Sequence, residues 1–227
     1  MEYFDGEYSA SLNSEDLYDQ DLPFIYNRAK GGTMVLWKSY LDPYLFVHTS
    51  ESTAFLPVII DIPNITTSIH IGLYLHTAVK EAEYLTELSK LTVALDELLL
   101  KHPNSIIYIR GDANSSKTNL KRDKLFSSFC KKFKLSRVPL NHNTYHHFCN
   151  FGYSDSELDV LLHSEHESVK ECLVQLLCQE ENPLVDSHHD LLVSTCKIPA
   201  LPSKIVDKSE NVSAPKLDNN RHRIVWS

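Results

Sequence analysis

Short apolar runs separated by turn residues dominate the first half of the chain. Four runs rich in β-branched and aromatic residues are typical of strands. They are Thr33–Lys38, Tyr44–His48, Leu56–Ile62 and Ile69–Leu75. Asp42-Pro43, a Ser/Thr cluster at 49–53 and Pro63-Asn64 lie between them, as turn residues do between strands. Their close spacing predicts antiparallel pairing.

Leucines at helical spacing follow these runs. Over 79–100 they fall on one stripe with charged residues off it, which predicts an amphipathic helix ending before Pro103. The stripe consists of Leu85, Leu88, Leu91, Leu95 and Leu98. A second amphipathic helix is predicted over 117–134. Its inward residues are expected to be Leu120, Phe126, Phe129, Cys130 and Phe133.

Three further apolar runs alternate with helical patterns. Ser105–Asn114, Leu158–Leu162 and Leu191–Ile198 each contain a run of buried-strand type, and 169–178 is interpreted as a third helix. Strands followed by a helix and a strand, twice over, predict a layered α/β sandwich. Helices would cover the outer faces of two packed sheets.

Length and composition fit one domain. The 227 residues, 42% of them hydrophobic, are enough to build a packed core. We expect an acidic loop segment at 1–30, a domain at 31–198 and a polar tail or linker at 199–227. No run approaches the length of a membrane span, so no membrane partner is expected.

Cysteine usage and the N-terminus predict the compartment. Five cysteines without a CxxC pair favour neither a disulfide framework nor a zinc site, which indicates reducing surroundings. The N-terminal stretch MEYFDGEYSA lacks the basic and apolar regions of a signal peptide. The protein is therefore expected inside the cell, in the nucleus or cytoplasm.

The stretch SIIYIRGDAN at 105–114 ends a predicted strand in polar residues. Gly111 breaks the apolar run, and Asp112 and Asn114 follow at once. Glycine lets backbone and side chains approach a ligand, and open α/β folds place their sites at this end of a strand. A plain turn is the alternative, because Gly, Asp and Asn are common turn residues.

Other polar residues lie in or beside predicted strands. Tyr74 is near the end of the strand at 69–75, Asp159 lies inside the strand at 158–162, and His189 precedes the last strand. A buried carboxylate needs a partner, and a histidine beside it stays usable as an acid or base. Each residue also has an ordinary interpretation, as a core tyrosine, a backbone-bonded aspartate or a solvated turn. Their joint occurrence favours one site.

Basic residues crowd the segment after Asn114. They are Lys117, Lys121, Arg122, Lys124, Lys131, Lys132, Lys134 and Arg137, and Asp123 is the one acid among them. The segment is either a surface for the DNA backbone or the solvated face of a helix. The net charge of −8 opposes nucleic-acid binding by the chain as a whole.

Five motifs in this order resemble those of the endonuclease/exonuclease/phosphatase superfamily. They are GGTMVLWK at 31–38, IGLYLHT at 71–77, RGDAN at 110–114, SELDVLL at 156–162 and SHHDLL at 187–192. More narrowly, they resemble the endonuclease domains of LINE-type retrotransposon polyproteins. The resemblance covers about residues 30–198 and implies a four-layered α/β sandwich of two packed sheets flanked by helices.

The resemblance implies hydrolysis of a phosphodiester, with a role for each matched residue. Asp112 would position the attacking water or accept its proton, and Asn114 would hold a phosphate oxygen. Asp159 would orient His189, which would stabilise charge in the transition state. Tyr74 would line the phosphate pocket.

The resemblance also implies a cation and substrate contacts. Mg²⁺ or Mn²⁺ would neutralise charge on the phosphate. His188 stands where the family has an aspartate, and Asp190 or Asp186 is close enough to replace that ligand. Thr144 and Tyr145 match an element that supports the site. The DNA contacts would be Lys117, Lys121 and Arg122.

Two departures from the family leave three functions open. Neither Glu2, Glu7 nor Glu15 matches the family's metal-binding glutamate. The first strands and helix of the fold are expected to be missing, so the domain is expected to be N-terminally truncated. Metal-dependent DNA nicking, intact or impaired, is the leading hypothesis. The alternatives are a catalytically dead remnant that binds DNA or protein, and a phosphatase acting on a lipid or inositol phosphate.

Overall fold

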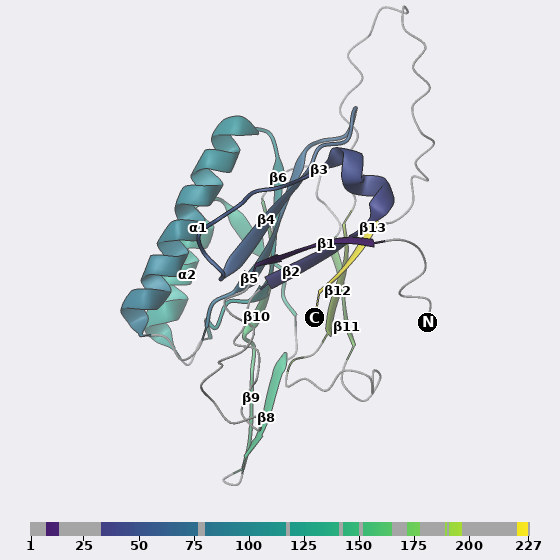
Figure 1. Ribbon diagram of the computed structural model, residues 1–227. Coiled ribbons are helices and arrows are strands. Elements are labelled where there is room, and N and C mark those ends of the chain that lie inside the picture. The colour runs from purple at the N-terminus through teal and green to yellow at the C-terminus, as the bar shows by residue number, and fades with distance from the viewer. Residues whose placement is uncertain are drawn as a thin grey trace, which may run out of the picture.

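A mixed six-stranded sheet forms the centre of the protein (Figure 1). In spatial order its strands are β3 (Leu45–Val47), β4 (Phe55–Ile60), β5 (Ser68–Tyr74), β6 (Ile106–Asp112), β10 (Asp159–Ser164) and β7 (Leu135–Arg137). Only β5 and β6 pair in parallel, and the other neighbours are antiparallel. The structure is a computed structural model that describes residues 8–13, 33–76, 80–116, 119–140, 143–149, 152–164, 172–177, 189, 191–196 and 222–226.

Two helices, α1 (Glu81–Lys101) and α2 (Leu120–Lys132), cover one face of this sheet (Figure 1). Alternate residues of β5 and β6 point into the core they share with the helices. The core includes Ile69, Ile71, Leu73, Ile107, Ile109, Leu88, Leu91, Leu95, Leu98, Phe126 and Phe129. The predicted helices at 79–100 and 117–134 are therefore confirmed, including most of their inward residues. None of the helices in the described ranges is long and apolar enough to cross a membrane.

Two expected core residues are exposed instead. Leu85 is 46% exposed, because Tyr84 lies four residues before Leu88 and continues the inward stripe. Leu120 is 66% exposed at the first position of α2. At the N-terminus of each helix, the buried face therefore differs from the predicted one.

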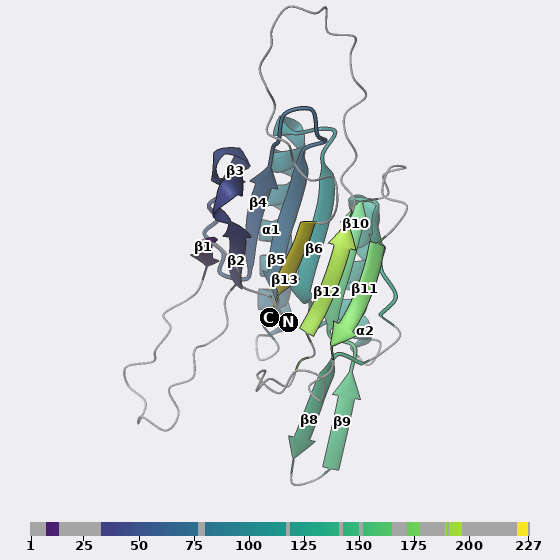
Figure 2. The same cartoon turned by 90° about the vertical axis from the view of Figure 1, so that its right-hand side faces the viewer.

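The opposite face of the sheet carries further strands (Figures 1 and 2). β1 (Tyr8–Asn13) pairs with β2 (Thr33–Lys38), and β12 (Leu191–Cys196) lies between β11 (Cys172–Leu177) and β13 (His222–Trp226). β2 contacts β4, β5 and β13. Val35 of β2 packs on Leu56 and Val58 of β4 in a small apolar cluster. The α/β class is confirmed.

A short helix and a hairpin complete the described elements. The 3-10 helix η1 (Ser39–Tyr44) connects β2 to β3. β8 (Tyr145–Cys149) and β9 (Gly152–Ser156) form an antiparallel hairpin that projects from the body (Figure 2).

Several sequence-based assignments are wrong. The helix expected over 169–178 is the strand β11, which pairs with β12 along all six of its residues. A ten-residue apolar pattern does not separate a strand from a helix, and a distant partner decides the outcome. β2 was expected to join the sheet of β3–β5, but it pairs with β1 inside the segment expected to be a loop. β13 lies in the expected tail and pairs with β12.

The parallel pair β5–β6 depends on one glycine. Gly111 has a φ of 127°, and a Cβ added there would lie 2.1 Å from the carbonyl oxygen of Leu73. The two backbones therefore approach to a distance that only glycine permits. This close approach fixes the end of β6 and the direction of the residues after it.

We expect Gly111→Ala to destabilise the protein by at least about 2 kcal/mol, because it combines a backbone clash with an unfavourable φ. The measurement is the free energy of unfolding in urea. Val93→Ala is the control, since Val93 is 55% exposed and its loss should change stability by under about 0.5 kcal/mol. Equal stability of Gly111→Ala and wild type would contradict the steric argument.

Candidate active site

The segment after Gly111 is held on both sides by neighbouring backbone. The N–H of Leu75 donates to the carbonyl of Asp112 at 2.9 Å, and the N–H of Ala113 donates to the carbonyl of Leu158 at 3.1 Å. Asp112 is the last residue of β6, and its side chain is buried. The strand end therefore has one defined position.

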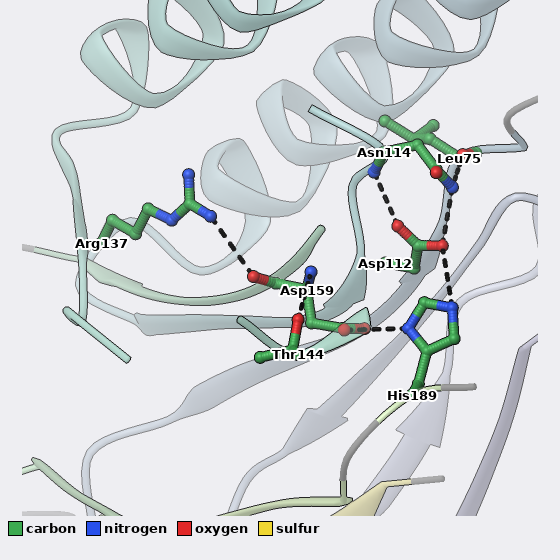
Figure 3. Close-up of polar contacts among 7 residues, drawn as sticks. All are labelled: Leu75, Asp112, Asn114, Arg137, Thr144, Asp159 and His189. Carbon is green, nitrogen blue, oxygen red and sulfur yellow. Dashed lines mark hydrogen bonds and ion pairs between the residues drawn. The ribbon is translucent and has the colours of Figure 1, made fainter. Parts of the chain in front are cut away.

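Asn114 turns back onto Asp112 (Figure 3). Its φ of 45° is left-handed, and its backbone N–H donates to Asp112 Oδ1 at 2.7 Å. Its side-chain Nδ2 donates to Asp112 Oδ2 at 2.7 Å and to the carbonyl of Leu75 at 2.6 Å. Asn114 Oδ1 is buried and has no hydrogen-bond partner among the described residues. A buried acceptor of this kind is suited to a bound water or ligand.

His189 lies between two carboxylates (Figure 3). β10 begins at Asp159, which lies opposite Asp112 in the antiparallel register. His189 and Asp159 form a hydrogen bond of 2.9 Å between Nδ1 and Oδ2, and His189 Nε2 lies 3.9 Å from Asp112 Oδ2. The bond at Nδ1 fixes the ring and leaves Nε2 facing Asp112.

Two residues of one short segment support this pair. Thr144 is fully buried, and its hydroxyl oxygen accepts the backbone N–H of Asp159 at 3.3 Å. The ring of Tyr145 lies 4.9 Å from the His189 ring, tilted by 58°, and the two residues form an isolated backbone bridge. Thr144 therefore fixes Asp159, and Tyr145 fixes His189.

Burial sets the electrostatics of Asp112. Desolvation, and then the negative charge of Asp159, raise the pKa of Asp112 to about 7. Hydrogen bonds from Asn114 and the proximity of His189 oppose this shift. Tyr74 is half-buried near the same carboxylate, and its pKa is raised by burial and by the charge of Asp112. The Tyr74 ring meets the His76 ring edge-on at 5.8 Å.

Sequence reasoning missed Tyr84 as a residue of the site. Tyr84 of α1 is fully buried, and its hydroxyl donates to the carbonyl of Ala113 at 3.1 Å. The guanidinium of Arg122 lies 4.7 Å over its ring. Tyr84 therefore joins both helices to the loop that carries Asn114. Its place four residues before Leu88 was the available signal.

Arg137 was also missed in this role. Its Nη2 donates to the carbonyl of Asp159 at 3.3 Å (Figure 3). The same atom lies 2.9 Å from Glu157 Oε1. The guanidinium therefore fixes the backbone at the start of β10, where Asp159 meets His189.

The structure brings together six of the predicted residues. They are Asp112, Asn114, Asp159, His189, Thr144 and Tyr145. Tyr74 is close enough to Asp112 that the charge of this carboxylate helps to raise the pKa of Tyr74. Lys121 is exposed and bonded to Glu81, and Arg122 is buried on Tyr84. Lys117 and Asp190 lie outside the described residues.

The two site carboxylates, Asp112 and Asp159, are the described candidates for ligands of the implied cation. Mg²⁺ binds through one or two protein carboxylates completed by water and substrate phosphates. Here Asp112 and Asp159 both face His189, and the described ranges contain no group of three or more metal-ligating side chains. The described residues therefore hold no complete set of protein ligands for the cation, and a cation at Asp112 or Asp159 would need water, substrate phosphate or a further residue to complete its coordination.

Comparison with known proteins gives matches in structure. No family model and no curated protein matches the sequence. The endonuclease domain of TRAS1, a telomere-specific non-LTR retrotransposon, matches with a TM-score of 0.55 and 15% identity, over 81% of this chain and 77% of that chain. The human Nocturnin catalytic domain matches with a TM-score of 0.54 and 12% identity, over 85% and 72%.

A mannosyl-6-phosphatase of Bacteroides thetaiotaomicron also matches, with a TM-score of 0.51 and 14% identity, over 85% of this chain and 77% of that chain. At such identities the likeness is one of fold. The helices on one face of a mixed sheet and the order of the motifs agree with it. The chain therefore has the fold of the endonuclease/exonuclease/phosphatase superfamily, as its motifs predict.

Proposed function

We propose that this chain hydrolyses phosphodiesters, and that its substrate is DNA, which it would nick as a retrotransposon-derived endonuclease domain. The observation that supports this most is the placement of His189 between Asp159 and Asp112, with Asn114 beside them. The likeness of the fold to the TRAS1 endonuclease domain supports the choice of DNA.

Asp112 is proposed as the base. With a pKa of about 7, it is ionised in a large fraction of molecules at neutral pH and still basic enough to take a proton. The unpartnered Oδ1 of Asn114 would accept a hydrogen bond from the attacking water. The water oxygen bonds to phosphorus, and its proton passes to Asp112. The P–O bond to the leaving oxygen then breaks, and that oxygen takes a proton from solvent.

His189 is proposed to stabilise the charge that develops on the phosphate. Asp159 accepts from Nδ1 and favours the protonated ring, so Nε2 is left to donate to a phosphate oxygen. Tyr74 would line the phosphate pocket, and Lys121 would contact the DNA backbone. Mg²⁺ or Mn²⁺, which the motif resemblance implies, would supply charge neutralisation. Asp190 stays the predicted ligand.

The proposed architecture goes beyond the central sheet. We infer that β1 and β2 form one second sheet with β11–β13, as a four-layered sandwich requires. The contact between β2 and β13 and the cluster of Val35 with Leu56 and Val58 support it.

A phosphatase is the second candidate function. The likeness of the fold to a mannosyl-6-phosphatase favours it, because the same site could accept a phosphomonoester. Hydrolysis of lipid, inositol or sugar phosphates, tested beside a plasmid, separates the two candidates.

Purified protein is expected to nick supercoiled plasmid, and Asp112→Asn and His189→Ala should each lower the rate by about 100-fold or more, as loss of acid–base groups does. His102→Ala, at the C-cap of α1, is the control. Each variant is compared with Mg²⁺, with Mn²⁺ and with chelator. A folded wild type that cleaves neither plasmid nor phosphomonoesters contradicts the proposal and favours a remnant that only binds.

The nicking rate should depend on the ionisation of Asp112. Since the carboxylate form of Asp112 is the base, the rate should rise with pH through about 7. Asp159→Asn removes one of the two causes of the raised pKa. The remaining activity should therefore have its midpoint at lower pH. A midpoint that does not move would contradict the coupling between the two carboxylates.

Tyr84→Phe should loosen the loop of Ala113 and Asn114 while the fold remains. Loss of one buried hydrogen bond, worth about 1 kcal/mol, should speed amide hydrogen exchange in this loop roughly fivefold. The turnover number should fall with little change in KM. Tyr108→Phe, which alters another fully buried tyrosine, is the control. Equal effects of the two substitutions would indicate general destabilisation only.

A further inference from the structure

Positive charge is concentrated in one short segment of an acidic chain. Of the 22 Lys and Arg residues, eight lie between positions 117 and 137, with one of the 30 Asp and Glu residues. The chain as a whole carries a net charge of −8. The structure shows which of these basic side chains are used within the fold and which face outward.

Two of the lysines join the helices. Lys121 Nζ lies 3.1 Å from Glu81 Oε2, and Lys132 Nζ lies 2.6 Å from Asp96 Oδ2. Both bridges cross from α2 to the acidic side of α1. These lysines are therefore at least partly neutralised by the protein itself.

The two arginines are engaged as well. Arg122 is buried with its guanidinium over the ring of Tyr84. Arg137 bridges Glu157 and the backbone of Asp159. Both arginines therefore act in positioning the site, and neither presents its full charge to solvent.

Of the four other lysines, Lys117 lies outside the described residues, and the remaining three are Lys124, Lys131 and Lys134. All are exposed, and in the described part of the chain none forms a salt bridge to an acidic side chain. Lys124 and Lys131 are seven residues apart, which places them on one face of α2 about 10 Å apart along its axis. Ser127 and Ser128, also exposed, lie between them. These five residues are named the α2 basic surface.

Helix stability accounts for only part of this surface. Lys131 lies in the last turn of α2, where a cation interacts favourably with the helix dipole. Lys124 lies in the first half of the helix and gains nothing from that dipole. An external polyanion is a partner that would use both lysines.

We propose that the α2 basic surface binds the phosphate backbone of duplex DNA, an inference that rests on DNA as the proposed substrate. Lysines contact phosphates without regard to sequence, and small hydroxyl side chains between them can donate to phosphate oxygens. α2 begins six residues after Asn114. The surface therefore lies on the helix that follows the site loop in the chain, and this helix belongs to the helix-covered face of the sheet (Figure 1).

The test is binding of a short fluorescent DNA duplex by the full chain, measured by anisotropy in chelator at several salt concentrations. The triple variant Lys124→Gln, Lys131→Gln and Lys134→Gln should bind about 10-fold or more weakly at low salt. The slope of log affinity against log salt should become shallower by about 3.

The matched control is Lys80→Gln, Lys90→Gln and Lys101→Gln, at the start, middle and end of α1. It changes the net charge by the same amount, and its affinity should stay within about twofold of wild type. Equal loss of affinity in the two triple variants would overturn the proposal, because net charge alone would then explain binding. A wild type that binds no duplex at low salt, or binds polyglutamate equally well, would also overturn it.

The binding and nicking assays distinguish a failure of the proposed DNA surface from a failure of the proposed hydrolysis. Wild-type binding that depends on the α2 basic surface, without any nicking, supports this surface and contradicts the proposed hydrolysis. Nicking with unchanged DNA affinity in the Lys124, Lys131 and Lys134 variant supports hydrolysis and contradicts the surface.

Discussion

The site depends on two buried carboxylates that the sheet forces to face each other. Asp112 ends β6 and Asp159 begins β10, and the antiparallel register places them opposite one another. Two like charges in a buried setting repel strongly, so one must hold a proton or a cation must lie between them. His189 lies in that place and lowers the pKa of Asp112, while burial and then the charge of Asp159 raise it. Gly111, Thr144, Arg137 and Tyr84 fix the backbone around this pair.

The amino-acid sequence predicted those parts of the fold and site that depend on local residue patterns. The periodicity of apolar residues located α1, α2 and every strand of the central sheet except β7, and the polar residues at strand ends marked Asp112, Asn114, Asp159 and His189 as neighbours. What it missed depends on distant partners. β11 became a strand through pairing with β12, and the hydroxyl of Tyr84 acquires a role only when α1 packs over residue 113. The pairing of β11 leaves no signal in its own segment, and the position of Tyr84 four residues before Leu88 indicates that its ring is buried but not which group its hydroxyl bonds.

The fold by itself leaves the chemistry open. Structures with a similar fold include an endonuclease domain and a sugar phosphatase, so the function must be argued from the site. The site has two features that suit transfer of a phosphoryl group to water: a carboxylate with a pKa near 7 and an open amide oxygen beside it. Both follow from burial, because an exposed aspartate would be fully ionised and an exposed amide would be hydrated.

An acidic protein with two carboxylates at its site repels a polyanion at long range. Binding of the proposed DNA substrate therefore requires a local attraction. Salt limits the reach of surface charges to about 8 Å in physiological conditions, so the distribution of charge matters more than its total. Lys121 and Lys132 form salt bridges to α1, whereas Lys124, Lys131 and Lys134 are exposed without one among the described residues. In this arrangement the packing of α1 on α2 both supports the loop of Asn114 through Tyr84 and presents Lys124 and Lys131 on the outer face. The same helix pair thus connects the proposed chemistry to the proposed DNA contact.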